Sequence, residues 1–179
     1  MKVADTQGWQ QAVREVDRLV DKLGTPMDAG IKDAVVTLKL LGYKTIGSCQ
    51  GHLDHGTGGP WIHLLIDEAE DLEKRLVRRR KNIPPLEAVL IRRQVKSVAN
   101  KHLQPLRRLL TEFYATRKVR LDLKISVYNP GGGFVVIESR GVNALLWKNL
   151  LEPRYSEKLL TDYQSEMSAL TSFLRTKLT

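Results

Sequence analysis

The sequence predicts an α+β fold, in which an antiparallel sheet built from two hairpins has helices packed on it. Strand-like segments occur in two pairs, each separated by a glycine-rich connection, and segments with helical spacing of apolar residues bracket both pairs. The 179 residues are 42% hydrophobic and 27% charged, which is typical of globular proteins, so we expect residues 1–179 to form a single domain.

Two amphipathic helices are expected first. Apolar residues recur at three- and four-residue steps over residues 9–23, which predicts a helix that ends at Gly24. Thr25-Pro26 then supplies an N-cap and a proline at the first helical position, and Asp28 supplies a carboxylate in the first turn. This second helix should close at Gly42 with a left-handed residue.

The first hairpin follows. Residues 43–48 read as a strand, and residues 60–66 read as a second strand, antiparallel to the first, beyond a long glycine-rich loop. In residues 67–81 acidic side chains precede basic ones, which is the order that the dipole of a helix favours.

A long helix and the second hairpin come next. Apolar spacing predicts a helix over residues 86–116, which Pro105 should kink or divide into two stacked helices. Apolar and polar residues alternate over residues 119–127, the pattern of a strand with one wet face, and a Gly-rich turn leads into residues 134–138. Two closing helices are expected around residues 142–151 and 156–178.

Composition and charge narrow the functional classes. No apolar run reaches the roughly 20 residues that a membrane span requires, the N-terminus lacks a secretory signal and the lone cysteine cannot form an internal disulfide, so we expect a cytoplasmic protein without a membrane partner. The net charge is +9, and basic residues concentrate on a helical segment at about residues 67–118. Such a surface either attracts a polyanion such as nucleic acid or is simply solvated. Arg79 and Arg93 are the candidate ligand-binding residues on this basic segment.

Residues 48–55 contain several side chains that can bind a metal or act as a nucleophile. Cys49, His52 and His55 are separated by two residues each, and His63 lies on the following strand, where it shares a face with Trp61. Thiolate and imidazole ligands suit zinc, so these four residues form one candidate metal set. The alternative is a small buried cysteine beside histidines that are hydrogen-bonded in a solvated loop.

Two other uses of the same loop stay open. Cys49 can act as a catalytic nucleophile with His52 or His63 as its base and Asp54 as the orienting group. Alternatively, Ser48, Gly51 and the later glycines can present backbone N–H groups to a phosphate, while the ring of Trp61 stacks on a base or another flat ligand.

The motif T-x-x-S-C-x-G-H resembles that of an uncharacterised family of bacterial proteins in which a P-W strand follows. The matching residues are Thr45, Ser48, Cys49, Gly51, His52, Pro60 and Trp61. More distantly, the segment is similar to the S-S-C-x-G-R pattern of wybutosine-synthesis tRNA methyltransferases, with Gly47 in place of the first serine and His52 in place of the arginine. That resemblance implies S-adenosylmethionine and tRNA as ligands, with Ser48, Cys49 and Gly51 at the site.

Three function classes therefore stand. The leading expectation is binding of a polar or phosphorylated ligand, nucleic acid included, through the Ser48-Cys49-Gly51-His52 loop beside the basic helical face. The second is an enzyme, such as a nucleic-acid-modifying transferase, that uses Cys49 and His52 as a metal or nucleophile site. The third is a phage or mobile-element module that binds a protein partner or a second copy of itself.

Overall fold

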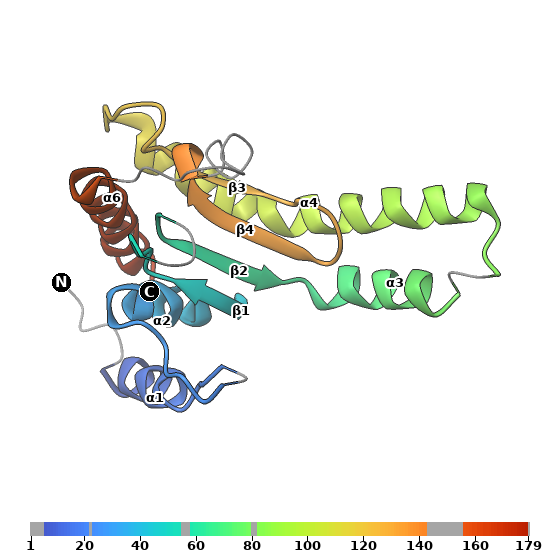
Figure 1. Ribbon diagram of the computed structural model, residues 1–179, viewed down its shortest axis with the longest axis horizontal. Helices are drawn as coiled ribbons and strands as arrows, with labels where there is room; N and C mark the ends of the chain where they lie inside the picture. The colour runs from blue at the N-terminus through green and yellow to red at the C-terminus, as the bar shows by residue number, and fades with distance from the viewer. Residues whose placement is uncertain (1–5, 22, 55–57, 80–81, 143–155, 179) are drawn as a thin grey trace.

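The computed structural model describes residues 6–21, 23–54, 58–79, 82–142 and 156–178, and it confirms the α+β class. Four strands form one antiparallel sheet in the order β1-β2-β4-β3, so the two expected hairpins pair through β2 and β4 (Figure 1). The strands are β1 (Lys44–Cys49), β2 (Trp61–Leu65), β3 (Ile125–Tyr128) and β4 (Phe134–Ser139).

The helices include α1 (Thr6–Asp17), α2 (Ala29–Leu40), α3 (Asp67–Arg78), α4 (Pro85–Ala115) and α6 (Glu157–Arg175). Apolar side chains of α2, α4 and α6 meet one face of the sheet, because strand alternation sends every second residue there. The buried residues of this contact include Leu38, Leu106, Met167 and Leu170 on the helices and Ile62, Val127 and Ile137 on the strands.

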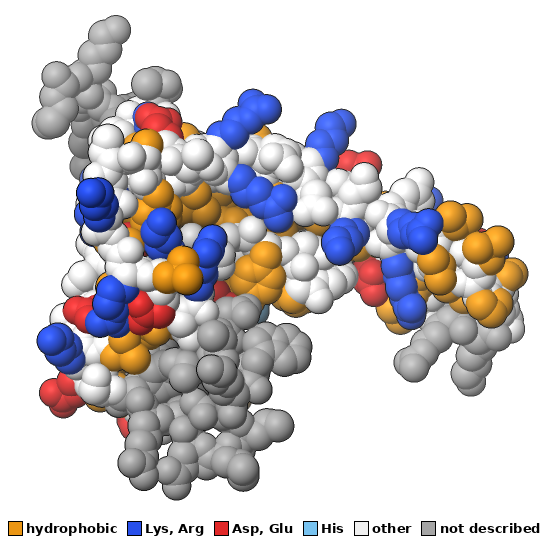
Figure 2. All heavy atoms as spheres, turned by 90° about the horizontal axis from the view of Figure 1, so that it is seen from above, with side chains coloured by type: hydrophobic (Ala, Val, Ile, Leu, Met, Phe, Trp, Pro, Cys, Tyr) orange, Lys and Arg blue, Asp and Glu red, His pale blue; other side chains and the backbone are white. Residues whose placement is uncertain are grey.

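Part of the basic segment forms an arm, which we define as α3 together with the N-terminal half of α4 (Figure 1). The sequence predicted that Pro105 would kink the helix over residues 86–116 or divide it into two; the division is wrong, because α4 runs as one element through Pro105. Pro105 is exposed, so water can hydrate the carbonyl that loses its helical partner. Lys and Arg side chains follow the arm and apolar side chains collect at its tip (Figure 2). The exposed apolar residues are Val77, Leu86, Val89 and Leu90.

The N-terminal helix ends earlier than its apolar spacing predicts. α1 stops at Asp17, and Val20 forms an isolated bridge with Pro26. The physical reason is a turn around Asp21, whose carboxylate accepts the backbone N–H groups of Leu23 and Thr25, both at 2.8 Å. Side-chain acceptors of this kind compete with helical hydrogen bonds.

The strand expected over residues 119–127 is also shorter, because β3 begins only at Ile125. The preceding residues form turns instead, with Leu123 N–H donating to the Arg120 carbonyl at 3.2 Å. β4 supplies ladder partners only as far as Ser139, which pairs with Ile125, so the earlier residues have no neighbouring strand. Alternation alone cannot reveal where a partner strand ends.

Other expectations are confirmed. Gly42 follows α2 with φ +85°, and β1 and β2 are antiparallel. The last long helix, α6, has Ser156 as its N-cap, whose Oγ accepts the Leu159 N–H at 3.2 Å. Residues 143–151 of the other closing helix lie outside the described residues. None of the helices in the described part of the chain is both long and apolar enough to cross a membrane.

Candidate functional site

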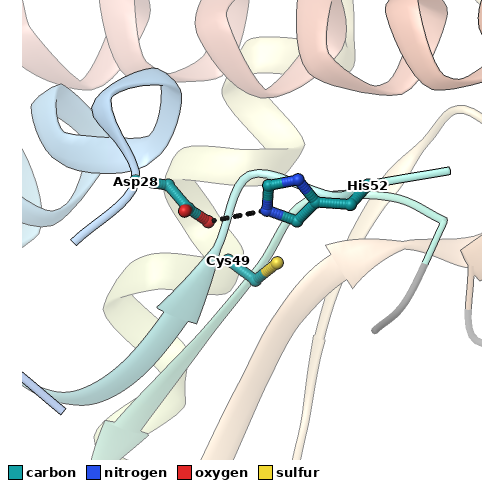
Figure 3. Close-up of side chains that lie close together, drawn as sticks. All are labelled: Asp28, Cys49 and His52. Carbon is teal, nitrogen blue, oxygen red and sulfur yellow. Dashed lines mark hydrogen bonds and ion pairs between the residues drawn. The ribbon is translucent and has the colours of Figure 1, made fainter. Parts of the chain in front are cut away.

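Three side chains with metal-ligating chemistry meet at the end of β1. Asp28 comes from the connection that leads into α2, Cys49 is the last residue of β1, and His52 lies in the loop that follows (Figure 3). One ligand atom from each residue, a carboxylate oxygen, the Sγ and a ring nitrogen, lies within 4.8 Å of the other two. The structure therefore brings Cys49 and His52 together as expected and adds Asp28, which the sequence predicted only as a carboxylate in the first turn of a helix.

Asp28 faces the loop because α2 begins one residue after it, at Ala29, and not at Pro26 as the sequence predicted. Its side chain makes no cap hydrogen bond to α2. Instead, Oδ2 accepts the Gln50 backbone N–H at 3.0 Å and lies 3.2 Å from His52 Nε2. The residue that usually caps its own helix is here turned towards the loop.

Gln50 fastens the loop to two helices. Its Oε1 accepts the backbone N–H of Gly30 in α2 at 2.9 Å, and its carbonyl accepts Nε2 of Gln164 in α6 at 3.1 Å. These contacts fix the backbone on either side of Gln50. The positions of Cys49 and His52 are thus set by the packing of the fold rather than by the loop alone.

Gly51 allows the loop backbone to pack closely against Gly59 and Leu160. Gly51 has φ +83°, and a Cβ on it would stand 2.7 Å from the backbone of Gly59 and 2.9 Å from Leu160. Gly51 is buried, and its N–H donates to Cys49 Sγ at 3.3 Å. The expectation that this N–H meets a phosphate is therefore replaced by a contact with sulfur, while residues 55–57, which include Gly56, lie outside the described part.

The surroundings shift the pKa values of Cys49 and Asp28 in opposite directions. Burial raises the pKa of the Cys49 thiol, the Gly51 N–H opposes this, and the nearby Asp28 carboxylate raises the pKa further. Burial would also raise the pKa of Asp28, but the hydrogen bonds from Gln50 and His52 outweigh it and hold that pKa below its usual value. At neutral pH the centre thus contains a carboxylate next to a protonated thiol.

The three side chains form part of the wall of a hollow of about 420 Å³ between β1 and the segment that precedes α2. That size falls within the range of small-molecule sites. Its walls are mixed in polarity, with carboxylate and hydroxyl groups on one part and apolar side chains on another. The other lining residues are Leu19, Val20, Asp21, Thr25, Pro26, Met27, Thr45, Ile46, Gly47 and Ser48.

The remaining expected site residues are placed as follows. Ser48 lines the hollow, Asp54 is exposed in the loop, and His55 lies outside the described residues. His63 does share a sheet face with Trp61, with ring centroids 4.3 Å apart, but it is not among the three residues whose ligand atoms come together. Burial lowers its pKa, which keeps the imidazole neutral.

Trp61 lies beside the site. It is opposite Cys49 in the register of β1 and β2, and its ring approaches within 3.4 Å of where a Cβ of Gly47 would stand. The ring therefore leans across β1, where a glycine offers no side chain. Trp61 is partly buried, so it forms part of the sheet face next to the candidate centre.

Arg79 and Arg93 lie on the arm, which leaves the sheet at the opposite end of β2 from the loop. Arg79 pairs with Glu87 across the turn between α3 and α4, with Nη1 2.5 Å from the carboxylate, and Arg93 is exposed on α4. The structure thus separates these two arginines from Cys49 and His52, and the loop does not lie beside the basic face of the arm.

A scan of the chain against protein-family models and searches of curated proteins and of solved structures find no match. The resemblance of the T-x-x-S-C-x-G-H motif to the two families, and the S-adenosylmethionine and tRNA that one of them implies, stay predictions.

Proposed function

We propose that this protein binds one divalent metal ion, zinc by the chemistry of its ligands, through Asp28, Cys49 and His52, and that the ion holds a polar or phosphorylated small molecule in the adjoining hollow. The observation that carries the proposal is the convergence of three different ligand atoms within 4.8 Å from segments more than 20 residues apart in sequence. Thiolate, imidazole and carboxylate are the ligands that zinc takes in proteins.

The spacing suits zinc. Ligand bonds of 2.0–2.3 Å in a tetrahedral site separate the ligand atoms by about 3.3–3.8 Å. The distance from Asp28 Oδ2 to His52 Nε2 is already 3.2 Å. All three ligand atoms lie within 4.8 Å of one another, so side-chain rotations that shift them by about 1 Å bring them to tetrahedral spacing. Two backbone groups already orient the ligand side chains, because the Gln50 N–H donates to Asp28 Oδ2 and the Gly51 N–H donates to Cys49 Sγ.

The electrostatics favour a metal ligand over a catalytic nucleophile. A nucleophilic cysteine needs a depressed pKa, but burial and the Asp28 carboxylate raise that of Cys49. A divalent cation reverses this preference, because it replaces the thiol proton and draws the carboxylate and the sulfur to the same point. The adjacent carboxylate that hinders a thiolate alone becomes a co-ligand.

Three protein ligands leave a fourth tetrahedral position, and all three line the hollow of about 420 Å³. An ion there supplies Lewis-acid chemistry towards an oxygen of the bound molecule, which is the basis for an enzymatic reading. The apolar side chains of Leu19, Val20 and Met27 would contact the non-polar part of that molecule.

The proposal is tested by titrating metal-free protein with Co²⁺, which replaces zinc and reports its ligands by absorption. We expect one tetrahedral site with a thiolate-to-cobalt band, and a spectral change when a small anion such as phosphate is added. Cys49→Ser should abolish the band and Asp28→Asn should weaken binding. Asp21→Asn is the matched control, because Asp21 lines the same hollow outside the ligand triplet. An octahedral spectrum that is identical in Cys49→Ser would rule out this centre.

A further inference from the structure

A second hollow lies at the far edge of the sheet, between β3 and the C-terminal half of α4. This hollow, which we call the groove, has a volume of about 540 Å³. Three cationic side chains line it: Arg107 on α4, Lys124 in the turn before β3, and Arg140, which directly follows β4. No acidic residue lines it within the described part of the chain. The other lining residues are Leu110, Thr111, Tyr114, Ala115, Ile125, Ser126 and Val127.

The fold holds these cations in place. Arg107 Nε donates to the carbonyl of Val127 on the outer edge of β3 at 3.4 Å, and Lys124 Nζ lies 5.4 Å from the ring centroid of Tyr114. The backbone N–H of Arg140 donates to the Lys124 carbonyl at 2.9 Å, which ties the two segments together. Residues far apart in sequence are thus brought to one groove by the same edge strand.

Three acidic residues near the groove are each paired with a cation that does not line it. Glu166 behind Tyr114 is bridged by Arg117, with Nη2 2.7 Å from Oε2. Asp122 is bridged by Arg120 at 2.7 Å, and Glu112 pairs with Lys177. Three like charges that converge without a carboxylate between them repel one another, and a bound anion relieves that repulsion.

The positive surface continues from the groove along α4. Between Glu87 and Glu112 the helix has no acidic residue, and its basic residues are Arg92, Arg93, Lys96, Lys101, Arg107 and Arg108. Figure 2 shows Lys and Arg side chains spread over this side of the molecule. A single small anion would occupy only the groove, whereas a chain of phosphates can follow both the groove and the helix.

We propose that the groove formed by Arg107, Lys124 and Arg140 binds the phosphodiester backbone of a nucleic acid strand, which continues along α4. The site is separate from the metal centre, which lies at the opposite edge of the sheet on β1. Recognition is electrostatic, so the groove fixes a phosphate position and carries no base preference of its own.

The test measures the anisotropy of a short fluorescent single-stranded oligonucleotide over a range of salt concentrations, with a chelator present so that the metal centre plays no part. A groove variant and a control variant each lose three positive charges, and the control charges lie on α1, the segment that follows it and α6. The groove variant is Arg107→Gln, Lys124→Gln, Arg140→Gln, and the control is Arg14→Gln, Arg18→Gln, Lys158→Gln.

We expect the groove variant to bind at least tenfold more weakly at low salt. Its negative slope of log K against log salt should become shallower by about 2, since each lost phosphate contact removes about 0.7 from the magnitude of the slope. The control should change affinity by no more than about twofold. Arg140→Gln alone keeps the proposal testable if the triple variant misfolds, and it should reduce the magnitude of the slope by about 0.7. Equal losses in the groove and control variants would overturn the proposal, as would absent binding at low salt or competition by AMP at equal phosphate concentration.

Discussion

Zinc should raise the thermal stability of the wild-type protein, because it binds three groups that come together only in the folded state. At a free zinc concentration 100 times Kd, this linkage stabilises the fold by about 2.7 kcal/mol. For a chain of 179 residues, each kcal/mol shifts Tm by about 2–4 °C, so the expected rise is about 5–11 °C. Each further tenfold increase in free zinc should raise Tm again.

The assay is scanning calorimetry of metal-free protein in a zinc buffer and in chelator. Cys49→Ser should lose nearly all of the zinc-dependent shift, because it removes the soft ligand, while its Tm in chelator should stay close to that of the wild type. Asp21→Asn should keep the full shift. If Cys49→Ser showed the same rise as the wild type, zinc would be acting elsewhere on the protein and the reasoning would fail.

Gln50→Ala removes the amide that fastens the loop to Gly30, so zinc affinity should fall about 10–100-fold. Competition with a chelating dye measures this affinity, and a loss below twofold would contradict the positioning role of Gln50. Gly51→Ala introduces both a strained φ and a 2.7 Å contact, and should cost about 1–3 kcal/mol in urea denaturation; an unchanged midpoint would argue against the observed loop geometry. Because burial raises the pKa of Cys49, zinc must displace the thiol proton, so apparent affinity should rise about tenfold from pH 7 to pH 8, and a flat profile would exclude thiolate ligation. Arg117→Met strands the buried Glu166 carboxylate and should cost about 3 kcal/mol, which a second change, Glu166→Gln, should largely restore.

The sequence predicted the fold class because its main signals are local. The helical spacing of α2 and α6, the glycine that closes α2 and the two hairpins are all encoded within short windows. The errors arose where a side-chain acceptor or the length of a partner strand decides the outcome. α1 ends at Asp17 because the Asp21 carboxylate forms a turn, and β3 starts late because β4 offers no further partner.

The candidate site could be predicted only in part. Cys49 and His52 were identifiable from their spacing around a glycine, but Asp28 lies 24 residues before His52 and reads as an ordinary residue of a helix start. Nothing in the sequence indicates that its side chain leaves α2 for the loop. His63 was expected at the centre because it follows on the paired strand, but its ring packs between Trp61 and Phe134, with centroids 4.3 and 5.4 Å away.

The basic groove was also beyond sequence reasoning. Arg107, Lys124 and Arg140 lie in three separate segments of the chain. Only the pairing of β3 with β4 brings Lys124 and Arg140 together. The basic segment at residues 67–118 includes Arg107 but neither Lys124 nor Arg140, and it equally includes Arg79, which pairs with Glu87. A run of like charges in a sequence does not show which of its members already have a partner in the fold.

Nondenaturing mass spectrometry of protein equilibrated with buffered zinc counts the ions bound to each chain. We predict one zinc ion per chain in the wild type and in Asp21→Asn, and none in Cys49→Ala or His52→Ala. A folded wild type that takes up no zinc, or a Cys49→Ala variant that retains one ion, would contradict the assignment of Asp28, Cys49 and His52 as a metal centre.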